Sequence, residues 1–172
     1  MKHTELVWPS IPTARVQAFA DRSVSRDDVS YLMQTARLAP SARNTQIWYF
    51  TVLTDRAVIR QAAEEAGQPR LAGAPLLIAA QGKPSFFRKM HDEQPFLMID
   101  VPIAMTHLSL AAREKGLALE WAFPRDEANA ISLLSLDQSL RLVALGFLGY
   151  AAESEDLPES VGCGAFRNEF LP

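Results

Sequence analysis

Cysteine is almost absent from this sequence, since Cys163 is the only one in 172 residues. A single thiol excludes an internal disulfide, which favours a reducing, cytoplasmic location. Cys163 lacks a companion motif, so we do not expect it to act as a nucleophile. The opening residues Met1–Glu5 are polar and no long apolar run follows them, so no secretory leader is expected.

Long apolar runs and a strong charge of either sign are missing as well. Charges and prolines interrupt the apolar stretches well short of the roughly 20 residues that span a membrane, so no membrane segment is expected. The formal net charge is −3 and no lysine or arginine run is dense, so nucleic acid is not an expected partner. His91-Asp92-Glu93 are adjacent loop residues, which rarely converge on one ion, so no metal is expected.

The remaining composition, 48% hydrophobic and 22% charged, is typical of a soluble globular protein. A chain of this length buries most of the surface that it exposes when unfolded, so we expect a single domain over residues 1–172. Pro9 and Pro12 disfavour helix and central strand, which predicts an extended N-terminal arm over residues 1–12. Residues 151–172 are predicted to form an acidic C-terminal tail, either solvated or wrapped on a partner.

Apolar periodicity and capping residues predict a succession of helices and strands. The predicted helices are one from Ser25 that ends before Pro40, one capped by Asp55 and ended by Gly67, one from about Asp100 to Lys115 with Pro102 in its first turn, and one capped by Asp126 that runs through Leu134. The predicted strands are Trp48–Leu53, a central strand at Pro75–Ala80, a strand or turn at Leu117–Phe123, and an alternating strand at Leu140–Tyr150 that closes the sheet. Lys83–Gln94 is predicted to be a surface excursion.

The segment Ala39–Trp48 is the candidate binding site. It places Ser41, Asn44 and Gln46 between a predicted helix and a predicted strand. Hydroxyl and amide groups held in this way can face the carbonyls and ring nitrogens of a flat heterocycle. From the spacing alone, a capped loop without a ligand is an equally good interpretation.

Four segments, in order, resemble the nitroreductase family. Pro40–Trp48 resembles its PSaxNxQPW signature, with Ile47 in place of the second proline. The other three are Asp21–Val29, which resembles dxpVsdedl, Ile99–Leu117, which resembles iDxxiAxxhlxLaAxexGLG, and Val143–Tyr150, which resembles vvalxxlGYP with Ala151 replacing its proline. The resemblance implies an α+β fold, a three-layer sandwich whose central, mostly antiparallel sheet is flanked by helices, in an intertwined homodimer.

The resemblance also implies an enzyme, an FMN-dependent oxidoreductase of the nitroreductase type. NAD(P)H would reduce the flavin, which would then pass two electrons to a nitroaromatic, quinone or related small-molecule acceptor in a ping-pong reaction. The chemistry would occur at flavin N5, so no catalytic side chain is implied. On this resemblance Pro40, Ser41, Ala42 and Asn44 would line the flavin from one subunit, and Gln46 would support the turn or reach the ring edge.

The sequence departs from the family at the cofactor's other contacts. The phosphate-binding segment RRSvRxF falls on residues 13–19, where only Val16 and Phe19 match; Arg15 is the sole cation and occupies the serine position. Gln17 replaces the cation that faces flavin N1 and O2. After Gly116-Leu117, where relatives have a glycine-containing turn near flavin N5, this chain has Phe123, Pro124 and Arg125. Arg125 is a candidate replacement cation.

A hydrogen bond to a charged group contributes roughly 1.5–3 kcal/mol, so losing two phosphate cations costs about two to four decades of affinity. Three outcomes follow: weak FMN binding, a changed phosphate pocket built on Arg15 and Arg125, or a different ligand. Two other functions stay open. One is a non-catalytic or ligand-sequestering protein with this fold, and the other is a flavoprotein subunit that acts on a specialised substrate with a partner chain.

Overall fold

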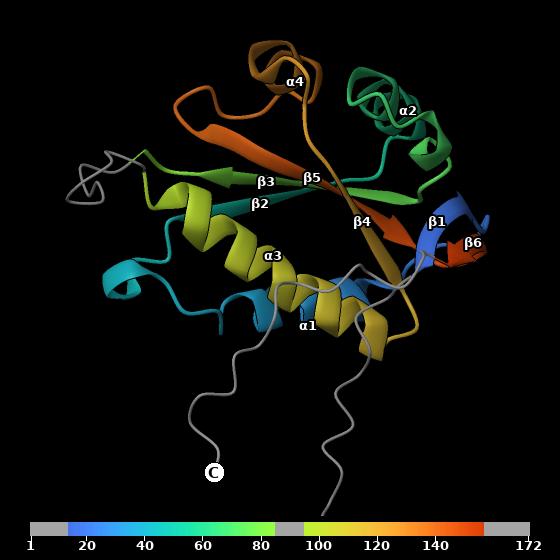
Figure 1. The fold of residues 1–172 in the computed structure, drawn as a ribbon, viewed down its shortest axis with the longest axis horizontal. Coiled ribbons are helices and arrows are strands. Elements are labelled where there is room, and N and C mark those ends of the chain that lie inside the picture. Colours follow the sequence, from blue (N-terminus) through green and yellow to red (C-terminus); the bar gives the residue numbers. More distant parts are fainter. Residues whose placement is uncertain (1–13, 85–94, 157–172) are drawn as a thin grey trace, which may run out of the picture.

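The computed structural model describes residues 14–84 and 95–156. A four-stranded antiparallel sheet forms its centre, in the order β2 (Trp48–Leu53), β3 (Leu76–Gly82), β5 (Arg141–Gly149), β4 (Ala118–Ala122). Figure 1 shows helices α1 (Arg26–Ala36) and α3 (Leu97–Glu114) below this sheet, and α2 (Arg56–Glu65) and α4 (Glu127–Leu133) above it. The prediction of an α+β three-layer sandwich is therefore confirmed.

Each face of the sheet has its own apolar core. Successive residues of β3 point to opposite faces, so Leu77 belongs to the core under α2 and α4, whereas Ile78 belongs to the core against α1 and α3. Phe147 fills the first core, and Met105 and Leu108 of α3 fill the second. All seven residues of β3 are buried, which confirms the predicted central strand.

The predicted helix starts are confirmed where a side-chain cap was identified. Ser25 Oγ accepts a hydrogen bond from Asp28 N at 3.0 Å and donates to its carboxylate at 2.6 Å. Asp55 Oδ1 and Asp126 Oδ1 accept backbone N–H groups at the starts of α2 and α4. Gly67, with φ of +67°, follows the end of α2.

Two sequence predictions for the main sheet and its longest helix are wrong. Helix α3 begins at Leu97, so Pro102 is its sixth residue and lies beyond the first turn. Strand β5 does not alternate: its last eight residues are all buried, and it lies between β3 and β4 instead of closing the sheet. Because a strand covered on both faces is apolar throughout, a pattern of alternating apolar and polar residues could not show its position in the sheet.

The acidic tail begins as a strand. Residues Ala151–Asp156 form β6, which pairs antiparallel with β1 (Ala14–Phe19) in a separate two-stranded sheet. The sequence had not indicated a strand here; residues 151–154 are nevertheless exposed to solvent, because strand pairing uses only backbone groups. The predicted arm, His91-Asp92-Glu93, Cys163 and residues 157–172 lie outside the described residues.

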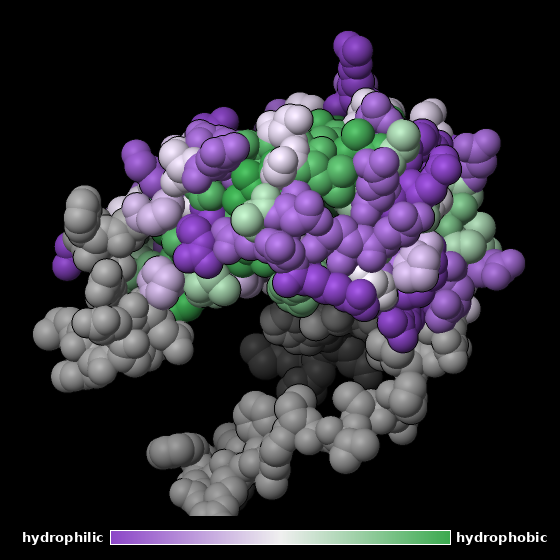
Figure 2. Space-filling view, turned by 90° about the horizontal axis from the view of Figure 1, so that it is seen from above, coloured by the Kyte–Doolittle hydropathy of each residue, from purple (hydrophilic) through white to green (hydrophobic). Residues whose placement is uncertain are grey.

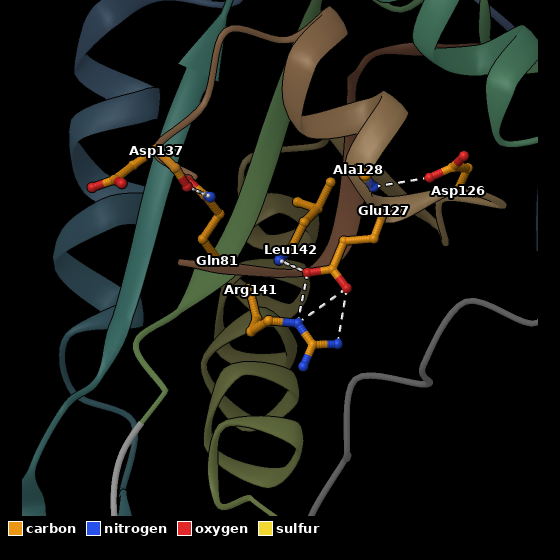
Figure 3. Close-up of polar contacts among 7 residues, drawn as sticks. All are labelled: Gln81, Asp126, Glu127, Ala128, Asp137, Arg141 and Leu142. Atoms are coloured by element: carbon orange, nitrogen blue, oxygen red, sulfur yellow. Dashed lines mark hydrogen bonds and ion pairs between the residues drawn. The ribbon is translucent and has the colours of Figure 1, made fainter. Parts of the chain in front are cut away.

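Polar side chains join the upper helical layer to the sheet (Figure 3). Arg141 Nε and Nη2 each donate to the Glu127 carboxylate at 2.8 Å, and Leu142 N donates to Glu127 Oε1 at 2.9 Å. Gln81, 1% exposed in β3, donates from Nε2 to the Asp137 carbonyl at 2.9 Å. Seen from above in Figure 2, this side of the molecule is largely hydrophilic around a hydrophobic strip.

Candidate functional site

Hydrogen bonds within the turn after α1 hold the predicted binding residues in a fixed arrangement. Ser41 Oγ accepts from Gln46 N at 2.9 Å, and the Ser41 carbonyl accepts from Asn44 N at 2.9 Å. The Gln46 amide donates to the Arg37 carbonyl at 2.9 Å, at the end of α1. Gln46 therefore supports the turn, which is one of the two roles that the sequence suggested for it.

Three residues of this turn have left-handed backbone conformations that are uncommon outside glycine. The φ angles are +53° at Arg43, +56° at Asn44 and +46° at Gln46. Such conformations cost of order 1–3 kcal/mol each and persist only where the surrounding contacts impose them. Residues of this kind cluster at ligand-binding and active sites, so the turn has the backbone character of a functional site.

Asp100 ties this turn to α3, and sequence reasoning had assigned it no role. Ala42 N donates to both carboxylate oxygens, at 3.1 Å to Oδ1 and 3.3 Å to Oδ2. The Asp100 residue is only 2% exposed. The sequence did offer a signal, an acidic residue within the mostly apolar run of α3. A carboxylate buried there requires a hydrogen-bond donor from another segment.

The Asn44 side chain is available to a ligand. The residue is exposed, and its amide makes no hydrogen bond with the described part of the chain. Two backbone hydrogen bonds hold its left-handed conformation: Asn44 N donates to the Ser41 carbonyl at 2.9 Å, and Thr45 N donates to the Ala42 carbonyl at 3.1 Å. Pro40 is exposed and Ser41 half-buried, so the turn presents a polar rim to solvent.

The predicted phosphate-binding segment is strand β1. Val16 is 4% exposed and belongs to the core, whereas Arg15 is exposed and donates to Gln68 Oε1 at 3.4 Å. The β1–β6 register passes from Val16 with Ser154 to Ala18 with Glu153, so Gln17 occupies a bulge. Phe19 packs into the same core as Val16.

The other predicted cation, Arg125, lies beside the end of α2. A Cβ atom added to Gly67 would lie 2.0 Å from Arg125 Nη2, so the guanidinium covers this glycine. Arg15 contacts Gln68, the residue after Gly67. The structure therefore brings both arginine side chains against the same turn, at two adjacent residues. Phe123, from the same loop as Arg125, is 61% exposed.

The predicted residues fall into two groups on opposite sides of the chain. In Figure 1, β1 lies at the right, whereas the turn with η1 (Ala42–Asn44), in cyan, lies at the left. One chain therefore does not bring the polar turn and the two arginines to the same ligand-sized site.

A separate groove of about 300 Å³ contains none of the predicted site residues. It is lined by Val24, Arg26, Val29, Val52, Thr54 and Leu76. In residues 14–84 and 95–156, no group of three His, Cys, Asp or Glu residues is placed to hold a metal ion. No helix of that part is both long and apolar enough to cross a membrane.

Comparisons with known proteins cover both groups of predicted residues. The profile of the nitroreductase family matches residues 14–68 and 57–150. A candidate NADH dehydrogenase/NAD(P)H nitroreductase of Archaeoglobus fulgidus is 28% identical over 151 residues, 84% of each chain. A nitroreductase family protein of Clostridium novyi NT superimposes with a TM-score of 0.73 and 25% identity over 80% of each chain. An FMN-dependent nitroreductase of Clostridium difficile R20291 shares the fold, with a TM-score of 0.70 and 20% identity over 84% of this chain and 87% of its own.

Proposed function

The chain belongs to the nitroreductase family, and from this premise we propose that it is an FMN-dependent oxidoreductase that takes electrons from NAD(P)H and reduces nitroaromatic, quinone or related small-molecule acceptors. The observation that carries the proposal is the turn at Pro40–Gln46, whose left-handed backbone is held by Ser41 and Asp100. Strained backbone that its surroundings hold in place in this way is concentrated at ligand-binding and active sites.

The donor set of the chain fits a flavin at both ends. The free Asn44 amide can both donate to and accept from the polar edge of an isoalloxazine ring. Arg15 and Arg125 offer exposed guanidinium groups, which bind phosphate through paired N–H donors. They are two cations that lie against the same turn, at Gly67 and Gln68, so we expect FMN to bind through a changed phosphate pocket and more weakly than with a full set of cations.

When bound, FMN supplies reversible two-electron chemistry, and the protein positions and surrounds it. Asn44 would orient the ring edge, Ser41 and Gln46 would hold Asn44 in place, and Gln17 would be a neutral donor where a cation is common. Phe123, being exposed, would cover part of the site as an apolar wall. A donor and an acceptor that use the same open face in turn would give ping-pong kinetics.

We further propose that two copies of the chain complete each site. The turn with Asn44 and the strand with Arg15 lie on opposite sides of one chain, so a single ligand can meet both only if a second copy supplies one of them. Helix α3 supports this, because Met98 and Leu110 are 50% and 44% exposed on a helix without a charged residue between Val101 and Ala112.

The direct test is to express the protein with added riboflavin and record its visible spectrum, followed by FMN titration of the apoprotein. We expect a flavin spectrum after titration, and NADH or NADPH oxidation that depends on a quinone. The N44G variant, in which glycine adopts the positive φ of this position without strain, should bind FMN more weakly while unfolding at a similar or higher urea concentration. A protein that stays colourless at high FMN concentration would exclude the proposed activity.

The alternative is a non-catalytic or ligand-sequestering protein with this fold. The observation that favours it is the pairing of acidic strand β6 with β1, which puts the exposed Glu153 beside the segment expected to bind phosphate. This interpretation predicts no NAD(P)H oxidation with any quinone or nitroaromatic acceptor. Turnover by the purified homodimer would exclude it, and would also exclude a requirement for a separate partner chain.

A further inference from the structure

We propose that Arg70 and Glu120 are positioning residues for the cofactor segment of β1, an inference that rests on the proposed function. Val16 N donates to Glu120 Oε1 at 3.1 Å, and Arg70 Nη1 donates to the Val16 carbonyl. Arg70 Nη2 and Glu120 Oε2 form an ion pair at 3.0 Å. One ion pair therefore engages both backbone polar groups of a single residue, and we call this arrangement the Val16 clamp.

The clamp adds polar contacts between the two-stranded sheet and the main body of the fold, which the core residues Val16 and Phe19 already join. Strands β1 and β6 form a two-stranded sheet of their own, and such a pair is marginally stable without further packing. Arg70 belongs to the short helix η2 (Pro69–Leu71), and Glu120 belongs to β4 of the main sheet. The two charged side chains thus fix β1 against two elements to which it has no strand pairing.

The clamped residue lies between the two side chains that matter for a cofactor. Arg15 precedes Val16 and, by strand alternation, projects from the opposite face; Gln17 follows Val16 and lies in the bulge, where this alternation is interrupted. Because Gln17 lies in the bulge, its direction depends on how the backbone is held immediately before it. Fixing Val16 by both its N–H and its carbonyl therefore fixes the directions of Arg15 and Gln17 together.

The two clamp residues act as a unit because they are mostly removed from water. The Arg70 and Glu120 side chains are 17% and 18% exposed. Removing one partner leaves the other charge poorly solvated and unpaired, which costs more than the loss of an exposed ion pair. Arg70 Nε is also buried without a hydrogen-bond partner in the described residues. The guanidinium therefore bonds to Val16 and Glu120 through Nη1 and Nη2 while its third nitrogen stays unpaired.

The fold offers a matched control in the ion pair of Glu127 and Arg141 (Figure 3). Glu127 likewise pairs with an arginine and accepts a backbone N–H, that of Leu142 at 2.9 Å, but it joins α4 to β5. R70M removes the donors that the clamp uses, E120Q removes the negative charge of its ion pair while an amide oxygen remains for Val16 N, and E127Q makes the same change in the control pair. For each apoprotein, FMN and riboflavin affinities are measured by fluorescence titration, and amide exchange of residues 14–19 is measured by mass spectrometry.

We expect E120Q and R70M to lower the preference for FMN over riboflavin by about tenfold, since the phosphate end loses a positioned donor. Amide exchange in β1 should become faster in both variants. E127Q should change neither quantity while lowering stability, because its pair lies in another layer. R70K is the milder variant to use if R70M does not fold.

Unchanged flavin preference in E120Q and R70M, with wild-type flavin binding intact, would overturn the clamp. An equal loss of preference in E127Q would also overturn it, because the effect would then be general destabilisation. If the wild-type protein binds neither flavin, the proposed function fails, and amide exchange of residues 14–19 then tests the clamp by itself. Unchanged exchange in E120Q and R70M would overturn the clamp. Faster exchange would support its hold on the strand.

Discussion

At the scale of single residues, Asp100 gives the turn its anchor. We expect D100A to lower the free energy of unfolding by about 1–3 kcal/mol, because the Ala42 N–H loses its acceptor in a partly buried place. D100N retains an oxygen acceptor and should cost less. Urea denaturation of the apoproteins measures both values, and equal stability of D100A and the wild type would show that the contact does not hold the turn.

A pair of glycines tests the location of Arg125. Gly67 and Gly116 both have positive φ, +67° and +69°, so alanine at either should cost roughly 1–2 kcal/mol of stability. Only at Gly67 would the new Cβ meet a side chain, the Arg125 guanidinium, which can move because it ends a flexible chain. We therefore expect similar urea midpoints for G67A and G116A, but weaker FMN binding in G67A alone. Equal FMN affinities would place Arg125 outside the phosphate pocket.

The sequence could indicate the polar turn but not its supports. Ser41, Asn44 and Gln46 are close together in the chain, so local spacing places them in one turn, and the same spacing fits a capped loop without a ligand equally well. Asp100 lies 58 positions from its partner Ala42, and Arg70 lies 54 positions from Val16. Contacts over such separations depend on the packing of whole elements, which periodicity and capping do not determine.

At the scale of elements, Glu127 and Arg141 make the attachment of α4 to β5 dependent on pH. The Arg141 guanidinium is the main cause that lowers the pKa of Glu127 in the folded protein, with a smaller lowering from the Leu142 N–H and an opposing effect of burial. A lowered folded-state pKa contributes stability that is present above the unfolded value, about 4.3 for glutamate, and lost as the pH falls through the folded value.

We therefore expect E127Q to lower the free energy of unfolding at pH 7 by about 0.5–1 kcal/mol, a modest amount because the pair is partly exposed to solvent. Below pH 4 the difference between E127Q and the wild type should shrink. Urea denaturation at pH 7, 5 and 3.5 measures it. A difference that stays constant across this range would show that Glu127 does not titrate against Arg141.

The elements themselves were predictable where a local signal defines them. Ser25, Asp55 and Asp126 accept backbone N–H groups within three residues, so each helix start is visible in the sequence. Strand β6 was missed because its pairing with β1 joins opposite ends of the chain. The start of α3 was misplaced because Pro102 is tolerated inside the helix, although it usually marks a first turn.

At the scale of the whole molecule, the two helical layers differ in what they present to solvent. Figure 2 shows hydrophilic residues around a hydrophobic strip on the α2 and α4 side. On α3, by contrast, Met98, Thr106 and Leu110 are exposed along a four-residue repeat that carries no charge. An uncharged row of exposed positions on a helix is typical of a surface that a partner covers, and under the proposed two-copy site that partner is a second copy of the chain.

We therefore expect the protein to sediment as a dimer, and L110E to shift it toward the monomer. A carboxylate buried in an apolar contact without a partner costs several kcal/mol, which is enough to raise the dissociation constant by about a hundredfold or more. A128E, which adds the same charge on exposed α4 in the opposite layer, should leave the dimer intact. If each site is built from both copies, as proposed, L110E should also lose FMN binding at concentrations where it is monomeric and should regain it as the concentration rises. A monomeric L110E protein that binds FMN as tightly as the wild type would mean that one chain suffices, and the opposed positions of Asn44 and Arg15 would then need another explanation.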